Sequence, residues 1–241
     1  MPVTFPSMHI HFVIHESCEA IGALERWVQT RNHHATYSRL HLHEPLPARV
    51  DDIDLLVVMG GPQSPDTTRE ACPHFDAAAE CALMRSAIDA GKAVVGVCLG
   101  AQLLGTALGA RHEQSPEREI GKFPITLTPE GRAHPLLAGF PAVLDSGHWH
   151  GDMPGLTPDA RVLATSAGCP RQIIEYTPRA FGFQCHMEFT PQVIDMLIAA
   201  SGPELRAYRD RPFVQSPEVL RQHDFTAANE LLFRFLDRLL A

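Results

Sequence analysis

A cysteine stands between two glycines at the end of an apolar run, because residues 94–100 read Val-Val-Gly-Val-Cys-Leu-Gly. Small residues two positions before and after a nucleophile allow the sharp strand-to-helix turn called a nucleophile elbow. Such a turn leaves the thiol at the N-terminus of a helix, where unpaired N–H groups and the positive end of the helix dipole favour the thiolate. The pattern therefore predicts that Cys98 is a reactive nucleophile. The alternative is a small buried cysteine at a tight turn.

A histidine and a glutamate, His186 and Glu188, lie two residues apart at the end of a second apolar run. Residues two apart on a strand share a face, so the carboxylate can fix one tautomer of the imidazole while the other nitrogen takes the proton of a thiol. Taken alone, the pair is better explained as a polar strand end with a local carboxylate partner. Together with Cys98, it favours a general base and its orienting acid.

A glycine pair follows a third apolar run, as Gly60-Gly61-Pro62 after residues 55–59. Glycine lets a backbone N–H group approach a ligand closely. In an acyl-transfer site, one such N–H group and that of Leu99, the residue after the nucleophile, would form an oxyanion hole. By itself, Gly-Gly-Pro predicts only a turn.

In this order, each at the end of an expected strand, the three segments resemble those of the class I (triad-type) glutamine amidotransferases. Within that family they are most similar to the amidotransferase domain of GMP synthase and its free-standing relatives. The resemblance implies that Cys98 attacks the side-chain amide of glutamine, with His186 as base and then acid and Glu188 as its orienting carboxylate. It also implies that the amides of Gly61 and Leu99 hold the oxyanion.

The resemblance extends to the residues that would bind the substrate. Gln102, one helical turn beyond the nucleophile, matches the family position that contacts glutamine. Residues 147–152, Gly-His-Trp-His-Gly-Asp, resemble the Ser-His-Gly-Asp segment that lines the pocket for the α-amino and α-carboxylate groups in relatives of GMP synthase. A tryptophan here occupies the place of the serine. The expected substrate-binding residues are thus Gly60, Gln102, His148, Trp149, His150 and Asp152.

The reaction that the resemblance implies is hydrolysis of glutamine to glutamate and ammonia through a γ-glutamyl thioester on Cys98. No segment resembles a phosphate-binding loop or a synthetase, so ammonia would be wasted unless a separate synthetase subunit takes it up. An independent hydrolase of γ-glutamyl peptides is the alternative enzyme. A non-catalytic module that binds a small molecule is the alternative from another class, although a complete set of Cys98, His186 and Glu188 favours an enzyme. We expect no cofactor.

Composition limits the partners and the compartment. The chain has 241 residues, 45% of them hydrophobic, enough for one large α/β domain. A net charge of -8 argues against a nucleic-acid partner. No apolar run reaches the roughly 18 residues of a membrane span, and the N-terminus lacks the layout of a signal peptide. Six cysteines without paired spacing are typical of a reducing compartment, so we expect a cytoplasmic protein that does not bind a membrane.

The 14 histidines include His-x-His pairs at 9/11, 41/43 and 148/150. On a strand, such a pair places both rings on one face, as a metal clip requires. The pairs lie on different expected elements, and no carboxylate or cysteine recurs at ligand spacing beside them. We therefore expect no metal, and assign His148 and His150 to the substrate pocket.

Apolar patterns of strand and helix type alternate along the chain. This alternation predicts an open, mostly parallel, doubly wound (flavodoxin-like) sheet with helices on both faces. The expected strands are 9–14, 35–42, 53–59 and 92–97, and the expected helices are 19–31, 73–90 and 225–240. Short β-like runs at 120–127, 161–167 and 172–176 predict a small additional meander.

The three motifs fall at the carboxyl ends of expected strands, where ligands of open α/β sheets gather. They should therefore meet in one site. We expect residues 1–241 to form a single domain with a helical extension over about 203–241, and the final amphipathic helix of that extension has no catalytic signature.

Overall fold

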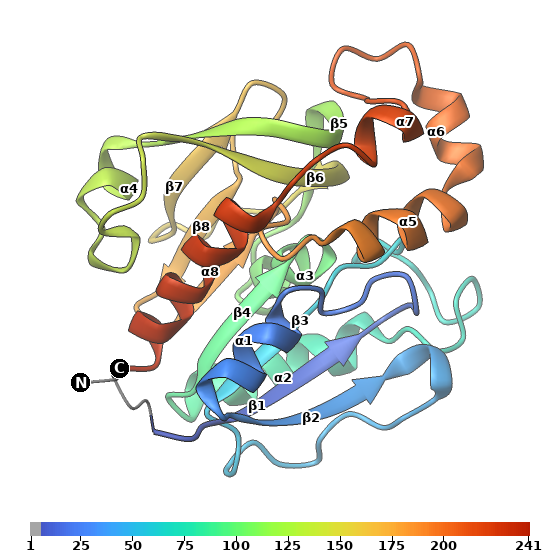
Figure 1. Ribbon diagram of the computed structural model, residues 1–241. Coiled ribbons are helices and arrows are strands. Elements are labelled where there is room, and N and C mark those ends of the chain that lie inside the picture. The colour runs from blue at the N-terminus through green and yellow to red at the C-terminus, as the bar shows by residue number, and fades with distance from the viewer. Residues whose placement is uncertain (1–5) are drawn as a thin grey trace.

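The computed structural model describes residues 6–241, which form a nine-stranded sheet with helices on both faces (Figure 1). The strand order is β2-β1-β3-β4-β9-β8-β7-β5-β6. The strands are β1 (His9–Ile14), β2 (His34–Arg39), β3 (Leu55–Val58), β4 (Ala93–Val97), β5 (Glu113–Leu127), β6 (Val143–Met153), β7 (Arg161–Ser166), β8 (Ile173–Thr177) and β9 (Ala180–Phe183). The helices are α1 (Leu24–Arg31), α2 (Ala77–Asp89), α3 (Leu99–Ala107), α4 (Pro129–Ala133), α5 (Pro191–Ala200), α6 (Gly202–Tyr208), α7 (Pro217–Leu220) and α8 (Thr226–Leu239), with short 3-10 turns η1 (Leu40–Leu42) and η2 (Pro135–Leu137).

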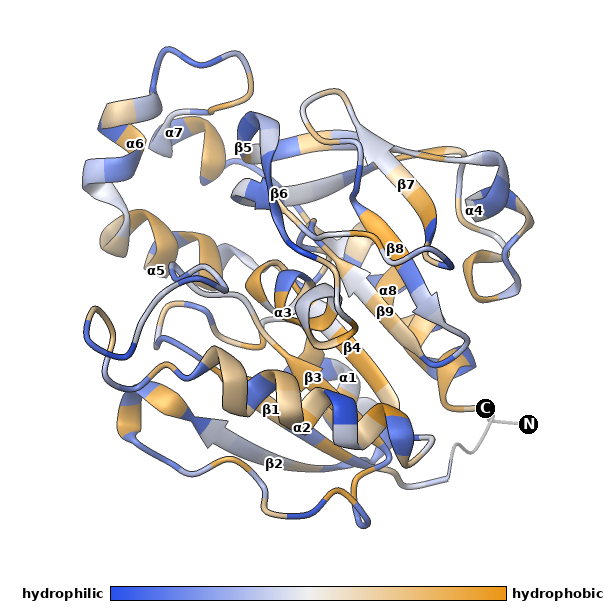
Figure 2. Cartoon of the chain, turned by 180° about the vertical axis from the view of Figure 1, so that it is seen from behind, coloured by the Kyte–Doolittle hydropathy of each residue, from blue (hydrophilic) through white to orange (hydrophobic). Residues whose placement is uncertain are grey.

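The five strands from β2 to β9 in this order pair in parallel, and β3, β4 and β9 are buried at every residue. Figure 2 shows these central strands in the hydrophobic colour. Helices α1 and α8 pack into the core on one face of the sheet, and α2 and α3 into the core on the other. Burial on both faces explains why these strands are continuous apolar runs. The expected open α/β sheet is confirmed.

Strands β8, β7, β5 and β6 continue the same sheet with antiparallel pairing. The expected meander is therefore larger than the sequence indicated and is joined edge to edge to the parallel strands. It includes β6, which was not predicted because its sequence, VLDSGHWHGDM, does not alternate between apolar and polar residues. This strand carries the segment that resembles the family's substrate pocket.

Several expected boundaries shift because tertiary contacts override local pattern. The helix expected over 19–31 begins only at Leu24, after Gly22 adopts a φ of 55° and the N–H of Ala23 donates to the carbonyl of Glu188. The strand expected over 35–42 ends at Arg39 and continues as a 3-10 turn. Helix α5 begins after Thr190, whose hydroxyl accepts from the N–H group of Val193 as an N-cap. Helices α6 and α7 were not predicted individually.

Among the described residues, no helix is long and apolar enough to cross a membrane.

The final helix, expected over 225–240, is present as α8. It also supports the segment after β9, because the buried Asn229 side chain donates to the carbonyls of Met187 at 2.7 Å and Phe189 at 3.1 Å. Helix α8 thereby holds the chain on both sides of Glu188.

Replacing this amide tests how far the last helix stabilises the fold. In Asn229→Ala two buried carbonyls lose their donor, and we expect the free energy of unfolding to fall by about 1–3 kcal/mol. Urea denaturation measures the change. The exposed Arg234 on the same helix offers the control, because Arg234→Ala should stay within about 0.5 kcal/mol of the parent protein. Equal effects of the two substitutions would contradict this role of Asn229.

Candidate active site

Cys98 lies in the turn between β4 and α3, with φ 51° and ψ −108°. A residue other than glycine in this region of backbone space is strained. A Cβ atom on Gly96 would lie 2.2 Å from the carbonyl oxygen of Gly100, and one on Gly100 would lie 1.9 Å from that of Val58. Only glycine fits at either position, so the local sequence builds the sharp turn that presents the thiol.

His186 and Glu188 lie side by side just after β9. His186 Nδ1 is 2.7 Å from Glu188 Oε1, and both side chains are buried. Backbone bonds of 2.8 and 3.0 Å between His186 and Gly147 of β6 hold the histidine, and its ring stacks on Phe189 with centroids 4.2 Å apart. Nδ1 is therefore occupied by Glu188, and Nε2 is the ring nitrogen without a hydrogen-bond partner among the described residues.

The electrostatics of this pair favour a charged imidazole. Burial disfavours charge on His186, but the Glu188 carboxylate and the neighbouring Cys98 outweigh it and raise the pKa of His186 well above its ordinary value. An imidazolium at this position stabilises a thiolate. The His186 imidazole thus interacts with both the Glu188 carboxylate and the Cys98 thiol.

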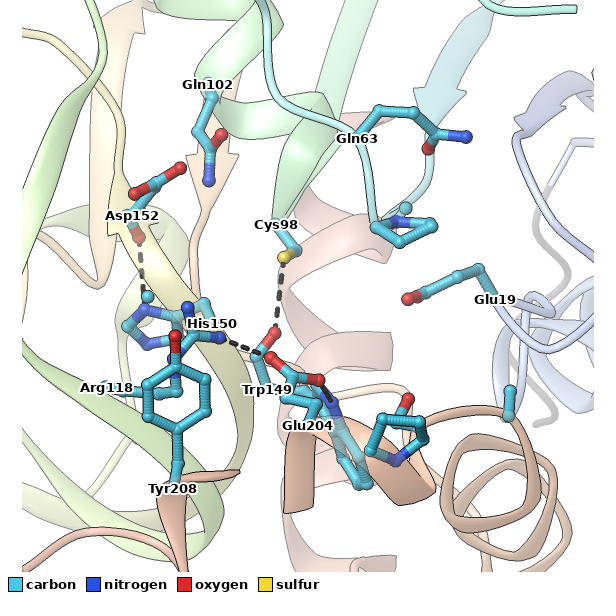
Figure 3. A pocket seen from close by; sticks show the side chains of 16 residues that line it. Glu19, Gln63, Cys98, Gln102, Arg118, Trp149, His150, Asp152, Glu204 and Tyr208 are labelled. Carbon is cyan, nitrogen blue, oxygen red and sulfur yellow. Dashed lines mark hydrogen bonds and ion pairs between the residues drawn. The ribbon is translucent and has the colours of Figure 1, made fainter. Parts of the chain in front are cut away.

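A cavity of about 460 Å³ opens at Cys98 (Figure 3). Its wall includes four of the expected substrate-binding residues, Gln102, Trp149, His150 and Asp152. The other two expected residues, Gly60 and His148, do not line it. The Cys98 thiol lies 3.7 Å from the carbonyl oxygen of Trp149, to which it donates.

The two expected oxyanion donors both lie next to the nucleophile's turn. Gly61 lines the cavity, and its N–H group donates to no other described residue. Leu99 is the first residue of α3, where helix geometry leaves the N–H group without an intrahelical partner. A Cβ atom on Gly61 would lie 2.9 Å from a methyl carbon of Leu99, so the two residues lie close together.

His148 and His150 flank Trp149 on β6 and both approach the buried Glu119. His150 Nε2 is 3.2 Å and His148 Nδ1 3.6 Å from Glu119 Oε2. The amide nitrogen of Gln172 lies among them, 2.7 Å from the same oxygen and 3.3 Å from each ring. Burial lowers the pKa of His148 to about 3, so this ring is neutral. The network supports the strand behind the cavity wall rather than offering His148 to a ligand.

Two groups of described side chains bring three metal-ligand atoms within 4.8 Å of one another: Glu119, His148 and His150, and Glu16, Cys72 and His74. In the first group the Gln172 amide nitrogen occupies the position between the ligands. In the second, His74 Nε2 is 2.8 Å from Glu16 Oε1, which is an ordinary hydrogen-bond distance. Hydrogen bonds account for both groups as they stand.

Among the cavity residues that were not predicted from the sequence, four have charged or aromatic side chains: Glu19, Arg118, Glu204 and Tyr208. The indole N–H of Trp149 donates to Glu204 at 3.0 Å, Glu204 also pairs with Arg118, and the Arg118 guanidinium lies over the Tyr208 ring at 4.2 Å. These contacts tie β5 and β6 to α6. The signal in the sequence was Trp149 itself, because a buried indole N–H needs an acceptor.

The His186–Glu188 contact generates a pH prediction. In Glu188→Gln the charge is lost and the shape kept, so only Cys98 still opposes the effect of burial and the pKa of His186 should fall. The imidazolium is then lost at a lower pH, and alkylation of Cys98 by iodoacetamide near pH 7 should slow by about tenfold or more. The pH profile of alkylation measures this, with the exposed Glu230→Gln as control. An unchanged profile would show that Glu188 does not set the charge of His186.

Comparisons with known proteins agree with this geometry. The sequence profile of the family described as glutamine amidotransferase class-I matches residues 14–202. The chain is 51% identical over 232 residues to the glutamine amidotransferase-like protein YfeJ of Salmonella typhimurium, covering 96% of this chain and 97% of that protein. It is 35% identical over 142 residues to the GMP synthase of Edwardsiella ictaluri, covering 56% of this chain and 25% of that protein.

Solved structures show the same fold over nearly the whole chain. The crystal structure of SMU.1228c superposes with a TM-score of 0.95 at 46% identity, covering 97% of this chain and 100% of that one. A glutamine amidotransferase of Thermotoga maritima superposes with a TM-score of 0.85 at 23% identity, covering 98% and 99%. With the profile match extending over most of its length, this chain belongs to the class-I glutamine amidotransferase family.

Proposed function

We propose that this chain hydrolyses the side-chain amide of glutamine to glutamate and ammonia through a γ-glutamyl thioester on Cys98. One observation carries the proposal: the strained cysteine opens into a cavity and lies beside a buried His186–Glu188 pair, in which the carboxylate raises the pKa of the imidazole. Membership of the family supports an amidase-type reaction.

In the first half of the reaction, Cys98 Sγ attacks the amide carbon and its proton resides on His186 Nε2. The carbonyl oxygen becomes an oxyanion, which the amides of Gly61 and Leu99 would stabilise. Each such donor contributes about 3–4 kcal/mol to related reactions. His186 then gives its proton to the nitrogen, the carbon–nitrogen bond breaks, ammonia leaves and the thioester remains.

In the second half, water takes the place of the departed amine. His186 accepts a proton from the water as its oxygen attacks the thioester carbon. A second oxyanion forms in the same hole, the carbon–sulfur bond breaks, and the sulfur leaves as a thiolate beside the charged imidazole. Glutamate leaves, and Cys98 and His186 are restored to their starting states.

A second candidate is the independent hydrolysis of γ-glutamyl compounds, and the wall of the cavity favours it. Pro203, Glu204 and Tyr208 line the cavity and lie beyond residue 202, where the family profile match ends. Part of the cavity wall is therefore supplied by the segment beyond the family profile. A cavity of about 460 Å³ lies within the range that binds small molecules.

The two candidates differ in the fate of the released nitrogen. The name of the GMP synthases that match this chain describes them as glutamine-hydrolyzing, and this chain spans about a quarter of the one from Edwardsiella ictaluri. Under the first candidate, a separate synthetase subunit would receive the ammonia. Under the second, the hydrolysis products are released without an acceptor.

Cys98→Ala is the test of the proposed chemistry, because it removes the sulfur and leaves the cavity. We expect release of ammonia from glutamine, and of amine from γ-glutamyl dipeptides, to fall by about a thousandfold or more. Cys81→Ala, outside the cavity, is the matched control and should keep the parent rate.

The results separate the functions. Cys98-dependent ammonia release from glutamine supports the first candidate, and turnover of dipeptides alone supports the second. Undiminished hydrolysis by Cys98→Ala would overturn both. If neither substrate is turned over and an electrophilic glutamine analogue labels all cysteines alike, the chain is a binding module.

A further inference from the structure

A buried histidine–glutamate pair holds the peptide between Gly60 and Gly61 from its carbonyl side. His15 Nδ1 is 2.8 Å from the carbonyl oxygen of Gly60, and His15 Nε2 is 2.7 Å from Glu80 Oε2. The exposed fractions of the His15 and Glu80 side chains are 0% and 1%. A carbonyl can only accept, so Nδ1 carries a hydrogen. The pair thus links the end of β1 and helix α2 to the glycine loop.

The orientation of this carbonyl decides the orientation of a candidate oxyanion donor. The oxygen of Gly60 and the N–H group of Gly61 belong to one planar trans peptide and point in opposite directions. Glycines on both sides would otherwise let the peptide flip at little steric cost. A flipped peptide would turn the Gly61 N–H group against the Nδ1–H of His15 and leave two buried donors without an acceptor.

We propose that His15 and Glu80 are positioning residues that keep the Gly61 amide directed into the oxyanion hole, so that the hole is formed in this chain without a partner protein. The proposal rests on the proposed function, because an oxyanion hole has a role only in acyl transfer. Burial disfavours charge on His15, but Glu80 outweighs it and raises the pKa of His15, which favours a hydrogen on Nε2 in addition to the one on Nδ1.

His15→Leu removes the donor, and His15→Asn keeps an amide N–H group near the position of Nδ1. We expect His15→Leu to lower kcat for amide hydrolysis by about tenfold to a hundredfold with KM within about threefold, and His15→Asn to recover most of the loss. Alkylation of Cys98 by iodoacetamide forms no oxyanion, so its rate should not change. A merely structural role would change both rates together.

Hydrogen exchange of residues 59–63 tests the same proposal without turnover. Exchange there should be faster in His15→Leu than in the parent chain and close to the parent rate in His15→Asn. If His15→Leu does not fold, Glu80→Met takes its place, because it removes only the carboxylate that holds His15. Its exchange over residues 59–63 should likewise be faster than in the parent chain. Parent-like exchange and hydrolysis in the Leu variant, or equal impairment in both His15 variants, overturn the proposal. If the parent chain does not hydrolyse amides but exchange of residues 59–63 is still faster in His15→Leu than in the parent chain, the result contradicts the proposed function instead.

A separate observation concerns Glu19, whose carboxylate faces the cavity and has no hydrogen-bond partner among the described side chains (Figure 3). Glu19 Oε2 lies 2.6 Å from the position that a Cβ atom on Gly60 would take, and His186 Cε1 lies 3.4 Å from that same position. The carboxylate is therefore beside the imidazole that gives its proton to the leaving nitrogen.

The cavity has two sides with respect to the nucleophile. In Figure 3, Gln102 and Asp152 lie on one side of Cys98, and Glu19 lies on the other. The first side carries the residues expected to bind the glutamyl group. The second side lies next to His186, which protonates the leaving nitrogen in the proposed mechanism, so the leaving amine would depart there. Glu19 is thus placed to contact the leaving group rather than the glutamyl group.

The charges on the described cavity wall are mainly negative. Its acidic side chains are Glu19, Asp152 and Glu204, and its one arginine, Arg118, is paired with Glu204. Burial raises the pKa of Glu19, and the positive charge of His186 opposes that rise. Glu19 forms no salt bridge among the described residues, so its carboxylate is available to a cationic group of a ligand, although the charged His186 acts on it.

We infer that Glu19 binds a positive charge on the leaving group, so that the preferred substrates are γ-glutamyl amides of amines that carry a second ammonium group. This inference rests on the proposed function in its second form. The reaction is the one already described, with the diamine leaving in place of ammonia and taking its proton from His186.

Three amides of similar length test the inference: γ-glutamylputrescine with a terminal ammonium, γ-glutamyl pentylamide with a methyl, and the γ-glutamyl amide of γ-aminobutyrate with a carboxylate. We expect kcat/KM to fall in that order, with the cationic amide favoured over the neutral one by about tenfold or more. Glu19→Gln should abolish that preference, and the exposed Glu70→Gln should retain it.

Labelling of Cys98 by an electrophilic glutamine analogue separates failure of the inference from failure of the chemistry. If the label forms at the parent rate in Glu19→Gln and only the preference is lost, the inference is supported. An unchanged order in Glu19→Gln, or no turnover of any of the three amides by a parent chain that is labelled, overturns it. Absence of labelling and turnover in the parent chain contradicts the proposed function itself.

Discussion

The strained backbone of Cys98 is the constraint on which the site depends. A φ of 51° at a residue other than glycine costs of order 1–3 kcal/mol, which surrounding contacts must offset. The neighbouring strands supply them: the Cys98 N–H group donates to Phe183 at the end of β9, and that of Gly100 donates to Met59 after β3. The same two strands lead directly into the glycine loop and into His186. The interactions that hold the turn therefore also bring the glycine loop and His186 to it.

Much of this arrangement followed from the sequence because its parts are local. The elbow depends on residues within two positions of Cys98, and the His186–Glu188 contact on residues two apart. Parallel strands bring their carboxyl ends to one edge of the sheet, so three motifs at strand ends indicated one site. The fold class was predictable for the same reason, since burial on both faces makes the central strands continuous apolar runs.

The residues that shape the cavity and fix the glycine loop could not be predicted, because they come together only through tertiary packing. Glu204 reaches Trp149 from a helix 55 residues further along the chain, and Glu80 reaches His15 across 65 residues. Strand β6 lacks an apolar alternation and was missed, although its motif was recognised. Local patterns give the chemistry of the nucleophile, whereas specificity and positioning depend on packing between distant elements. Glu19 was also not predicted, because it lies in the turns that replace the first part of the helix expected over 19–31.

The central claim is that amide cleavage proceeds through an acyl group on Cys98, and rapid acid quenching during turnover tests it most directly. Peptide mass analysis of the quenched protein should show one γ-glutamyl group on the peptide that contains Cys98, and hydroxylamine added before quenching should divert that group to the hydroxamate. Turnover with the acyl group on another residue, or with neither adduct nor hydroxamate, would contradict the account.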